Sequence, residues 1–169
     1  MKAWYLNPMS IEPVRTDGFI GNVKEGGSVN FRNIQFNPHG HGTHTECLGH
    51  ITKEIYSVNE HIKSFVFTAE LITIAPKLKG EDQIITLDQL VDKLGDNSPE
   101  AIVFRTLPNN DKKLTRQYSA SNPAYLDVKV ALELQKRGVK HLLIDTPSVD
   151  REEDGGHLLS HHAFWNVPD

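Results

Sequence analysis

Apolar residues in the second half of the chain recur with the spacing of an amphipathic helix. In the segment 87–94 they stand at positions i, i+3, i+4 and i+7. Thr86 and Gln89 have the spacing of a capping box at its start, and Gly95 follows its end. The pattern predicts a helix between Thr86 and Gly95 whose apolar stripe faces the core.

Two apolar runs, 101–107 and 139–145, predict strands, and the first is of the kind that is buried on both faces. Between them, Asn122 and Pro123 are typical of a cap and a first-turn proline, so we expect a helix over 124–137. Strand, helix and strand in this order indicate a right-handed crossover between parallel strands. The loop 145–150 would then lie where open α/β sheets bind ligands.

The first half of the chain has weaker patterns. Residues up to 25 predict loops and short edge strands. The alternation over 29–36 changes phase once, which predicts a strand with a bulge near Arg32 and Asn33. A weak helical period over 51–61 and a β-rich run over 65–75 follow. Together the elements predict an α/β protein, a single domain over residues 1–169 with a mixed sheet and flanking helices.

Composition narrows the class of protein. A 169-residue chain with 38% hydrophobic and 24% charged residues is ordinary for a soluble globular domain. The net charge of −4 and the absence of a basic run argue against nucleic acid as a partner. A single cysteine excludes an internal disulfide framework, and no apolar stretch has the length of a membrane span. We therefore expect a cytoplasmic protein with a small-molecule substrate.

Candidate chemistry is concentrated between residues 39 and 50. This stretch contains four histidines and one glutamate, and imidazole with carboxylate is a ligand set for zinc or manganese. In an extended segment, alternate side chains share a face, so one pair of these groups would point the same way. These candidate residues are His39, His41, His44, Glu46 and His50, the pair being His44 with Glu46.

A second histidine cluster spans residues 157–162, and the two clusters hold seven of the nine histidines. Metal sites are commonly assembled from distant segments in this way. The alternative is a solvated loop after Pro38, because histidines often lie at the surface. Alternation turns Cys47 away from a metal, so we interpret it as a small buried hydrophobic residue.

Three segments resemble motifs of one family. The segment from Gly42 to His50 resembles the H-x-G-T-H-x-D-x-x-x-H signature of the cyclase-like metal-dependent hydrolases, the group that contains bacterial kynurenine formamidase and isatin hydrolase. Segments 145–150 and 160–163 resemble the D-T-P-S-x-D loop and the second histidine motif of that family. The resemblance implies a swivelling β/β/α fold, a homodimer, and His44, Glu46 and His161 as metal ligands.

The sequence also departs from the family pattern. Gly40 stands where the family has its first histidine, and His39 or His41 could replace that ligand if the loop carried a bulge. Glu46 replaces an aspartate and has a longer reach. The glutamate that follows the second histidine motif in the family has no counterpart before Asp169. We therefore expect the domain to be shortened at both ends.

The resemblance implies a metal-dependent hydrolase of a linear or cyclic amide, such as N-formylkynurenine or an isatin-type lactam. A divalent ion, zinc or manganese, would activate water as the nucleophile. His50 matches the histidine that moves the proton. Asp145 and Ser148 are expected to support a metal-binding histidine through hydrogen bonds, although the same residues are typical of any turn. The alternative function is a non-catalytic or impaired metal-binding member of the same fold.

Overall fold

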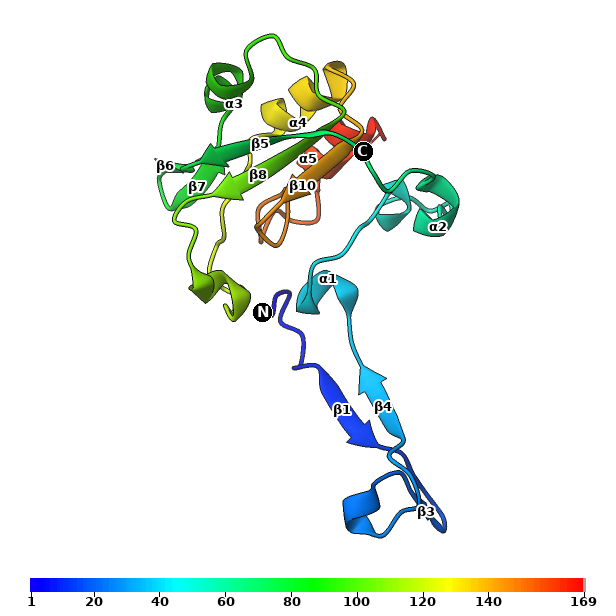
Figure 1. Ribbon diagram of the computed structural model, residues 1–169. Helices are drawn as coiled ribbons and strands as arrows, with labels where there is room; N and C mark the ends of the chain where they lie inside the picture. The colour runs from blue at the N-terminus through cyan, green and yellow to red at the C-terminus, as the bar shows by residue number, and fades with distance from the viewer. Residues whose placement is uncertain (169) are drawn as a thin grey trace.

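Three parallel strands form the centre of the larger part of the molecule. In the computed structural model, which describes residues 1–168, the strands β10 (His141–Ile144), β8 (Ala101–Thr106) and β5 (Ala69–Ile74) pair in this order (Figure 1). Helix α4 (Val128–Lys136) lies between β8 and β10 in the chain. The predicted parallel crossover is therefore confirmed.

One face of this sheet carries the core. Helix α3 (Leu87–Leu94) begins with the predicted capping box and packs with α4 against the strands. The other face is open: the side chain of Arg105 is exposed, and Leu71 and Leu143 are 53% and 41% exposed. The prediction that the run 101–107 is buried on both faces is wrong, because the helices cover only one. The core residues are Ile72, Ile74, Ile85, Leu90, Leu94, Ile102, Phe104, Leu126, Val130, Leu134 and Val139.

Helix α4 begins later than the sequence predicts. Its N-cap is Asp127, whose side chain accepts a hydrogen bond from the backbone N–H of Lys129. The preceding residues form β9 (Tyr125–Leu126), which pairs with β7 (Asp82–Ile85); β7 also pairs with β6 (Lys77–Lys79). Asn122 donates from its side-chain amide to Asp82, 2.8 Å away. Tyr125 and Leu126, which were expected in the first turn of the helix, therefore pair as a strand instead.

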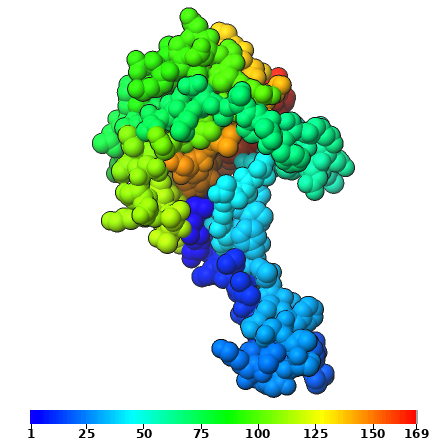
Figure 2. All heavy atoms as spheres, in the orientation of Figure 1, coloured from blue at the N-terminus to red at the C-terminus, as the bar shows by residue number. Residues whose placement is uncertain are grey.

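An arm projects from the body at the N-terminal end of the chain (Figures 1 and 2). It consists of β1 (Ser10–Pro13) paired with β4 (Arg32–Gln35), and β2 (Arg15–Thr16) paired with β3 (Phe19–Ile20). The turn η1 (Val23–Glu25) lies near its tip. The register of β1 with β4 is regular through Arg32 and Asn33, so the predicted bulge is wrong. Phe31, which precedes β4, accepts the backbone N–H of Val14 and donates its own to the carbonyl of Gly21.

Short helical turns connect the arm to the body. These are α1 (Pro38–His41), η2 (Leu48–His50) and α2 (Val58–His61). Of the segment 51–61, for which the sequence indicates a helical period, only α2 forms an α-helix. Farther along lie η3 (Asp111–Leu114) and α5 (Leu159–Trp165), which packs on α4. Within residues 1–168, no helix is long and apolar enough to cross a membrane. The architecture is mixed α/β, as the sequence predicts.

Candidate metal centre

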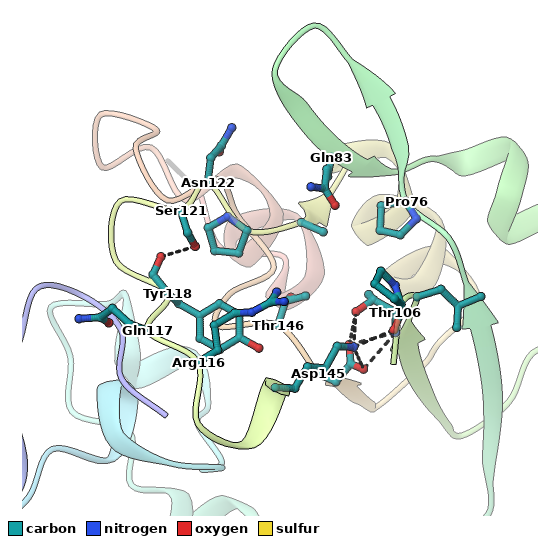
Figure 3. A pocket seen from close by; sticks show the side chains of 15 residues that line it. Pro76, Gln83, Thr106, Arg116, Gln117, Tyr118, Ser121, Asn122, Asp145 and Thr146 are labelled. Atoms are coloured by element: carbon teal, nitrogen blue, oxygen red, sulfur yellow. Dashed lines mark hydrogen bonds and ion pairs between the residues drawn. The ribbon is translucent and has the colours of Figure 1, made fainter. Parts of the chain in front are cut away.

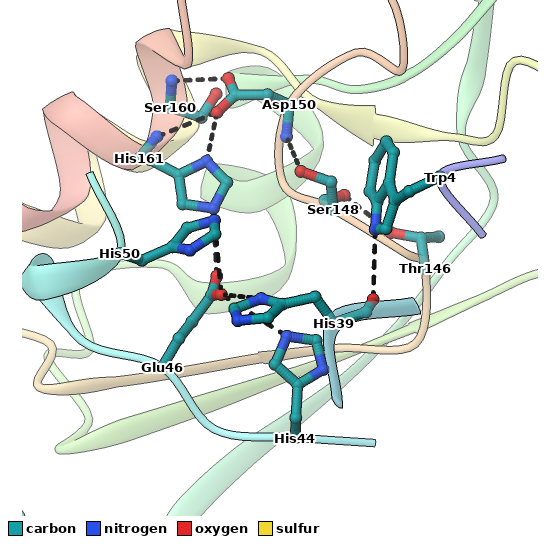
Figure 4. A network of polar contacts seen from close by, with 10 residues as sticks. All are labelled: Trp4, His39, His44, Glu46, His50, Thr146, Ser148, Asp150, Ser160 and His161. Carbon is teal, nitrogen blue, oxygen red and sulfur yellow. Dashed lines mark hydrogen bonds and ion pairs between the residues drawn. The ribbon is translucent and has the colours of Figure 1, made fainter. Parts of the chain in front are cut away.

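Side chains from two distant parts of the chain meet around one carboxylate (Figure 4). Glu46 Oε2 lies 3.1 Å from His39 Nδ1, 3.5 Å from His44 Nε2 and 3.7 Å from His50 Nε2. The second oxygen, Oε1, lies 3.2 Å from His161 Nε2. We name His39, His44, Glu46, His50 and His161 the imidazole cluster. The predicted convergence of the middle and the tail of the chain is present.

The helical turn α1 explains why His39 joins the cluster and His41 does not. Residues two apart on a helix point in nearly opposite directions. The ring of His41 faces away: Nδ1 accepts from the backbone N–H of Asn37 at 2.9 Å, and Nε2 lies 2.9 Å from the carbonyl of Asn7. The structure thus replaces the expected bulge with a turn of helix that begins at Pro38.

Close packing accounts for the glycine at position 40. Gly40 is buried, and a Cβ atom there would lie 2.3 Å from Leu6 Cδ1. Its carbonyl also accepts a hydrogen bond from the backbone N–H of Ala3, at 3.0 Å. The same Cβ atom would lie 3.1 Å from the carbonyl oxygen of Ala3, so any side chain at this position would require the side chain of Leu6 to shift and Ala3 to give slightly. Trp4 reinforces this contact by donating from its indole to the carbonyl of His39 at 3.1 Å.

Two rings of the cluster are oriented by partners on their far side. Nδ1 of His44 lies 3.1 Å from the carbonyl of Gly42, and Nδ1 of His161 lies 2.6 Å from Asp150 Oδ2. Each contact requires Nδ1 to donate its hydrogen, which leaves Nε2 directed at the cluster. Metal-binding histidines in proteins almost always have such a carbonyl or carboxylate partner.

Asp150 is held in turn by the start of α5. Its carboxylate accepts backbone N–H groups of Ser160 at 2.7 Å and of His161 at 3.1 Å. Both Asp150 and His161 are buried, each 7% exposed. Ser148 supports this arrangement because its hydroxyl accepts the backbone N–H of Asp150 at 3.0 Å. The expected supporting role of Ser148 therefore reaches His161 through Asp150.

Asp145 takes a different place from the one expected. Its carboxylate accepts hydrogen bonds from the backbone N–H and hydroxyl of Thr106, and it pairs with Lys113 Nζ at 2.7 Å. It therefore binds β8 and η3 rather than a histidine. Asp150, from the same motif, is the residue that contacts His161, and the sequence did not single it out. Its position in the resembling D-T-P-S-x-D loop was the available signal.

The charges of the cluster reinforce one another. Burial raises the pKa of Glu46, but the hydrogen bond from His161 and the charges of His50, His161 and His44 outweigh it and lower the pKa to about 2. Burial likewise lowers the pKa of His161, but hydrogen bonds to Asp150 and Glu46 raise it to about 9. Without a cation, His161 is therefore an imidazolium between two carboxylates.

His50 has the opposite tendency. Burial lowers the pKa of His50, and the neighbouring histidines lower it further against the opposing effect of Glu46. Its ring stacks on that of His39, with centroids 4.6 Å apart. At neutral pH His50 is consequently a neutral imidazole able to accept a proton.

Comparison with known families agrees with this geometry. The model of the Cyclase family matches residues 1–151. The chain belongs to the Cyclase family. The match contains the 39–50 stretch and Asp150 but ends before His161, whose place in the cluster comes from the coordinates. No curated protein matches the chain. Membership in the Cyclase family indicates an enzyme, and one of a typically metal-dependent kind.

The donor set fits a divalent cation. Two overlapping groups, each with ligand atoms within 4.8 Å of one another, share the carboxylate of Glu46: His39 with His44, and His50 with His161. Imidazole and carboxylate together suit zinc or manganese. Cys47 is outside both groups; its thiol donates to the carbonyl of Tyr56 at 3.3 Å.

Proposed function

We propose that this Cyclase-family protein is a metal-dependent hydrolase of a linear or cyclic amide. The observation that carries the proposal is the convergence of four imidazoles on Glu46, with His44 and His161 oriented from behind by Gly42 and Asp150. A second hydrogen bond that fixes the orientation of the ring is typical of metal-binding histidines.

The residues of the imidazole cluster would have two roles, metal binding and proton transfer. His39, His44 and Glu46 would hold an ion on one side of the carboxylate, and His161 would be a ligand on its other side, so Glu46 would contribute an oxygen to each half of the cluster. A bound divalent ion lowers the pKa of its water ligand, to about 7 for zinc, and polarises a carbonyl group. His50 would accept the proton of the attacking water and return it to the leaving nitrogen, since it is neutral at neutral pH.

Activity measurements with and without metal test the proposal. The metal-free protein is supplied with Zn²⁺ or Mn²⁺ and offered N-formylkynurenine and isatin, the substrates that the family resemblance implies. We expect turnover that disappears on chelation and returns with metal. Full turnover after chelation would remove the metal from the mechanism.

Matched glutamate variants separate the site from the rest of the protein. Glu46→Gln removes the shared carboxylate and is expected to lower kcat/KM by about a thousandfold or more, whereas Glu70→Gln changes an exposed glutamate on β5 and should leave it unchanged. Equal activity of Glu46→Gln and the unmodified protein would contradict the proposal. Stoichiometric metal without turnover of any amide would favour the non-catalytic alternative.

We also propose that the protein forms a homodimer through the arm. Ile11 and Ile34 face each other across β1 and β4 and are 54% and 66% exposed, and Met9, Phe31 and Phe36 are exposed near them. A two-stranded ribbon with apolar side chains in water is marginally stable, so a partner surface is expected to cover it. Light scattering of Ile34→Asp should show a smaller mass than the unmodified protein. The cytoplasmic location stays a prediction.

A further inference from the structure

A second polar centre occupies the edge of the central sheet. A cavity of about 210 Å³ opens where the parallel strands end: Pro76 follows β5, Leu107 follows β8, and Asp145 follows β10 (Figure 3). Open α/β sheets bind ligands at the carboxyl ends of their strands. The loop that begins at Asp145 continues to Asp150, so this cavity and the imidazole cluster use successive parts of one loop.

One of the two cations in this cavity is already neutralised. Lys113 Nζ lies 2.7 Å from Asp145 Oδ2 and donates to the carbonyl and hydroxyl oxygens of Thr106, at 2.7 and 2.8 Å. Its three hydrogens are therefore satisfied within the protein. The lysine and Asp145 together form a fixed, charge-balanced wall.

Arg116 is the cation that stays available. Its guanidinium lies over the ring of Tyr118, 5.6 Å from the centroid, and it has no carboxylate partner among residues 1–168. The backbone is tied to Lys2 on both sides of Gln117: the N–H of Lys2 donates to the carbonyl of Arg116, and the carbonyl of Lys2 accepts from the N–H of Tyr118. The side chain of Arg116 is exposed, but the backbone that carries it is held by these hydrogen bonds.

The other lining groups suit an organic anion. Burial raises the pKa of Tyr118, against the effect of Arg116 and with that of Asp145, so its phenol keeps its proton at neutral pH. Gln83 lines the cavity from β7 (Figure 3), and Pro76, Leu107 and Pro108 add apolar surface. A guanidinium presents two parallel N–H groups that match the two oxygens of a carboxylate.

We propose that this cavity is a binding site for a small carboxylate, which pairs with the guanidinium of Arg116 and places its organic part against the prolines. Because Lys113 is already paired with Asp145, Arg116 is the cation of the cavity that would pair with the anion. The site is separate from the imidazole cluster and does not rest on the proposed hydrolase function.

Titration of the metal-free protein tests the proposal without involving the imidazole cluster. Sodium benzoate and sodium acetate are each added while the ¹H–¹⁵N NMR spectrum is recorded, including the side-chain Nε–H of Arg116. We expect saturable shifts at Arg116 and at the backbone of Tyr118 and Thr146. Inorganic phosphate should bind more weakly than benzoate, because it lacks an apolar part.

Arginine variants complete the test. Arg116→Gln should weaken benzoate binding about tenfold or more, since it removes a charge-assisted pair. Arg32→Gln, the same change on the exposed arm, should have no effect. Arg116→Lys keeps the charge without the two parallel donors and should bind with intermediate affinity. Absence of saturation with both carboxylates, undiminished binding by Arg116→Gln, or tighter binding of phosphate than of benzoate would overturn the proposal.

Discussion

Two regions of the molecule contain strands with apolar residues: the body, residues 69–165, and the arm, residues 9–36. Their apolar side chains differ greatly in exposure to solvent. Ile102 and Phe104 of β8 are fully buried, whereas Ile34 of β4 is 66% exposed. The difference lies in what covers them: α3 and α4 pack on β8, while β1 and β4 have only each other. An apolar strand therefore contributes to stability only where another layer receives its side chains.

The imidazole cluster lies at the junction of these two regions. His39, His44, Glu46 and His50 follow the arm, whereas His161 and Asp150 belong to the body. A cation held there would add metal–ligand bonds between the segment 39–50 and the body, beside the backbone hydrogen bonds that join Lys2 to Arg116 and Tyr118. Substitutions in the body, the junction and the arm should therefore have separable effects on stability and metal binding.

The largest expected effect comes from the body. Phe104→Ala removes a fully buried ring and should lower the free energy of unfolding by about 3–5 kcal/mol. Ile34→Ala in the arm should change it by less than about 0.5 kcal/mol in dilute solution. Urea denaturation followed by circular dichroism measures both. A cost of several kcal/mol for Ile34→Ala at all protein concentrations would show that the arm is buried within one chain.

A smaller effect is expected at the junction. Asp150→Asn keeps the size of the side chain but weakens the hold on Nδ1 of His161, so zinc affinity should fall about 10- to 100-fold. Competition with a chromophoric chelator measures this affinity. Asp92→Asn, an exposed position on α3, is the matched control and should bind zinc normally. The same affinity for both variants would mean that Asp150 does not support a ligand.

The metal-free protein should also show a pH dependence of stability. The pKa of Glu46 falls from 4.5 to about 2, so its contribution to stability is complete above pH 4.5 and is lost as the pH falls toward 2. The pKa of His161 rises from 6.5 to about 9, so its contribution is complete below pH 6.5 and is lost as the pH rises through 9. Both contributions are complete only between pH 4.5 and 6.5.

Thermal unfolding at a series of pH values checks this window. The unmodified protein should have a higher melting temperature at pH 5.5 than at pH 9.5 or pH 3. In Glu46→Gln the decline on the acid side should be shallower, because one of the titrating carboxylates is gone. A melting temperature that rises steadily from pH 5.5 to pH 9.5 would contradict the assignment of a raised pKa to His161.

Several local elements and the candidate chemistry could be read directly from the order of residues. The helix after Thr86 and the parallel strands β8 and β10 could be predicted from spacing, and His44, Glu46, His50 and His161 could be named as candidate site residues from the resemblance. These features depend on neighbours in the chain, where periodicity and caps act. Family membership also agrees with the motifs that the sequence displays.

Which side chains contact one another depends on how distant segments pack. A helical turn at Pro38 brings in His39 and turns His41 away, and packing of Leu6 explains the glycine at position 40. Pairing of β9 with β7 delays α4, and Asp150 rather than Asp145 supports His161. Each outcome depends on contacts between segments far apart in the chain. Local spacing cannot encode them, because packing selects among arrangements that the local sequence leaves nearly equal in energy.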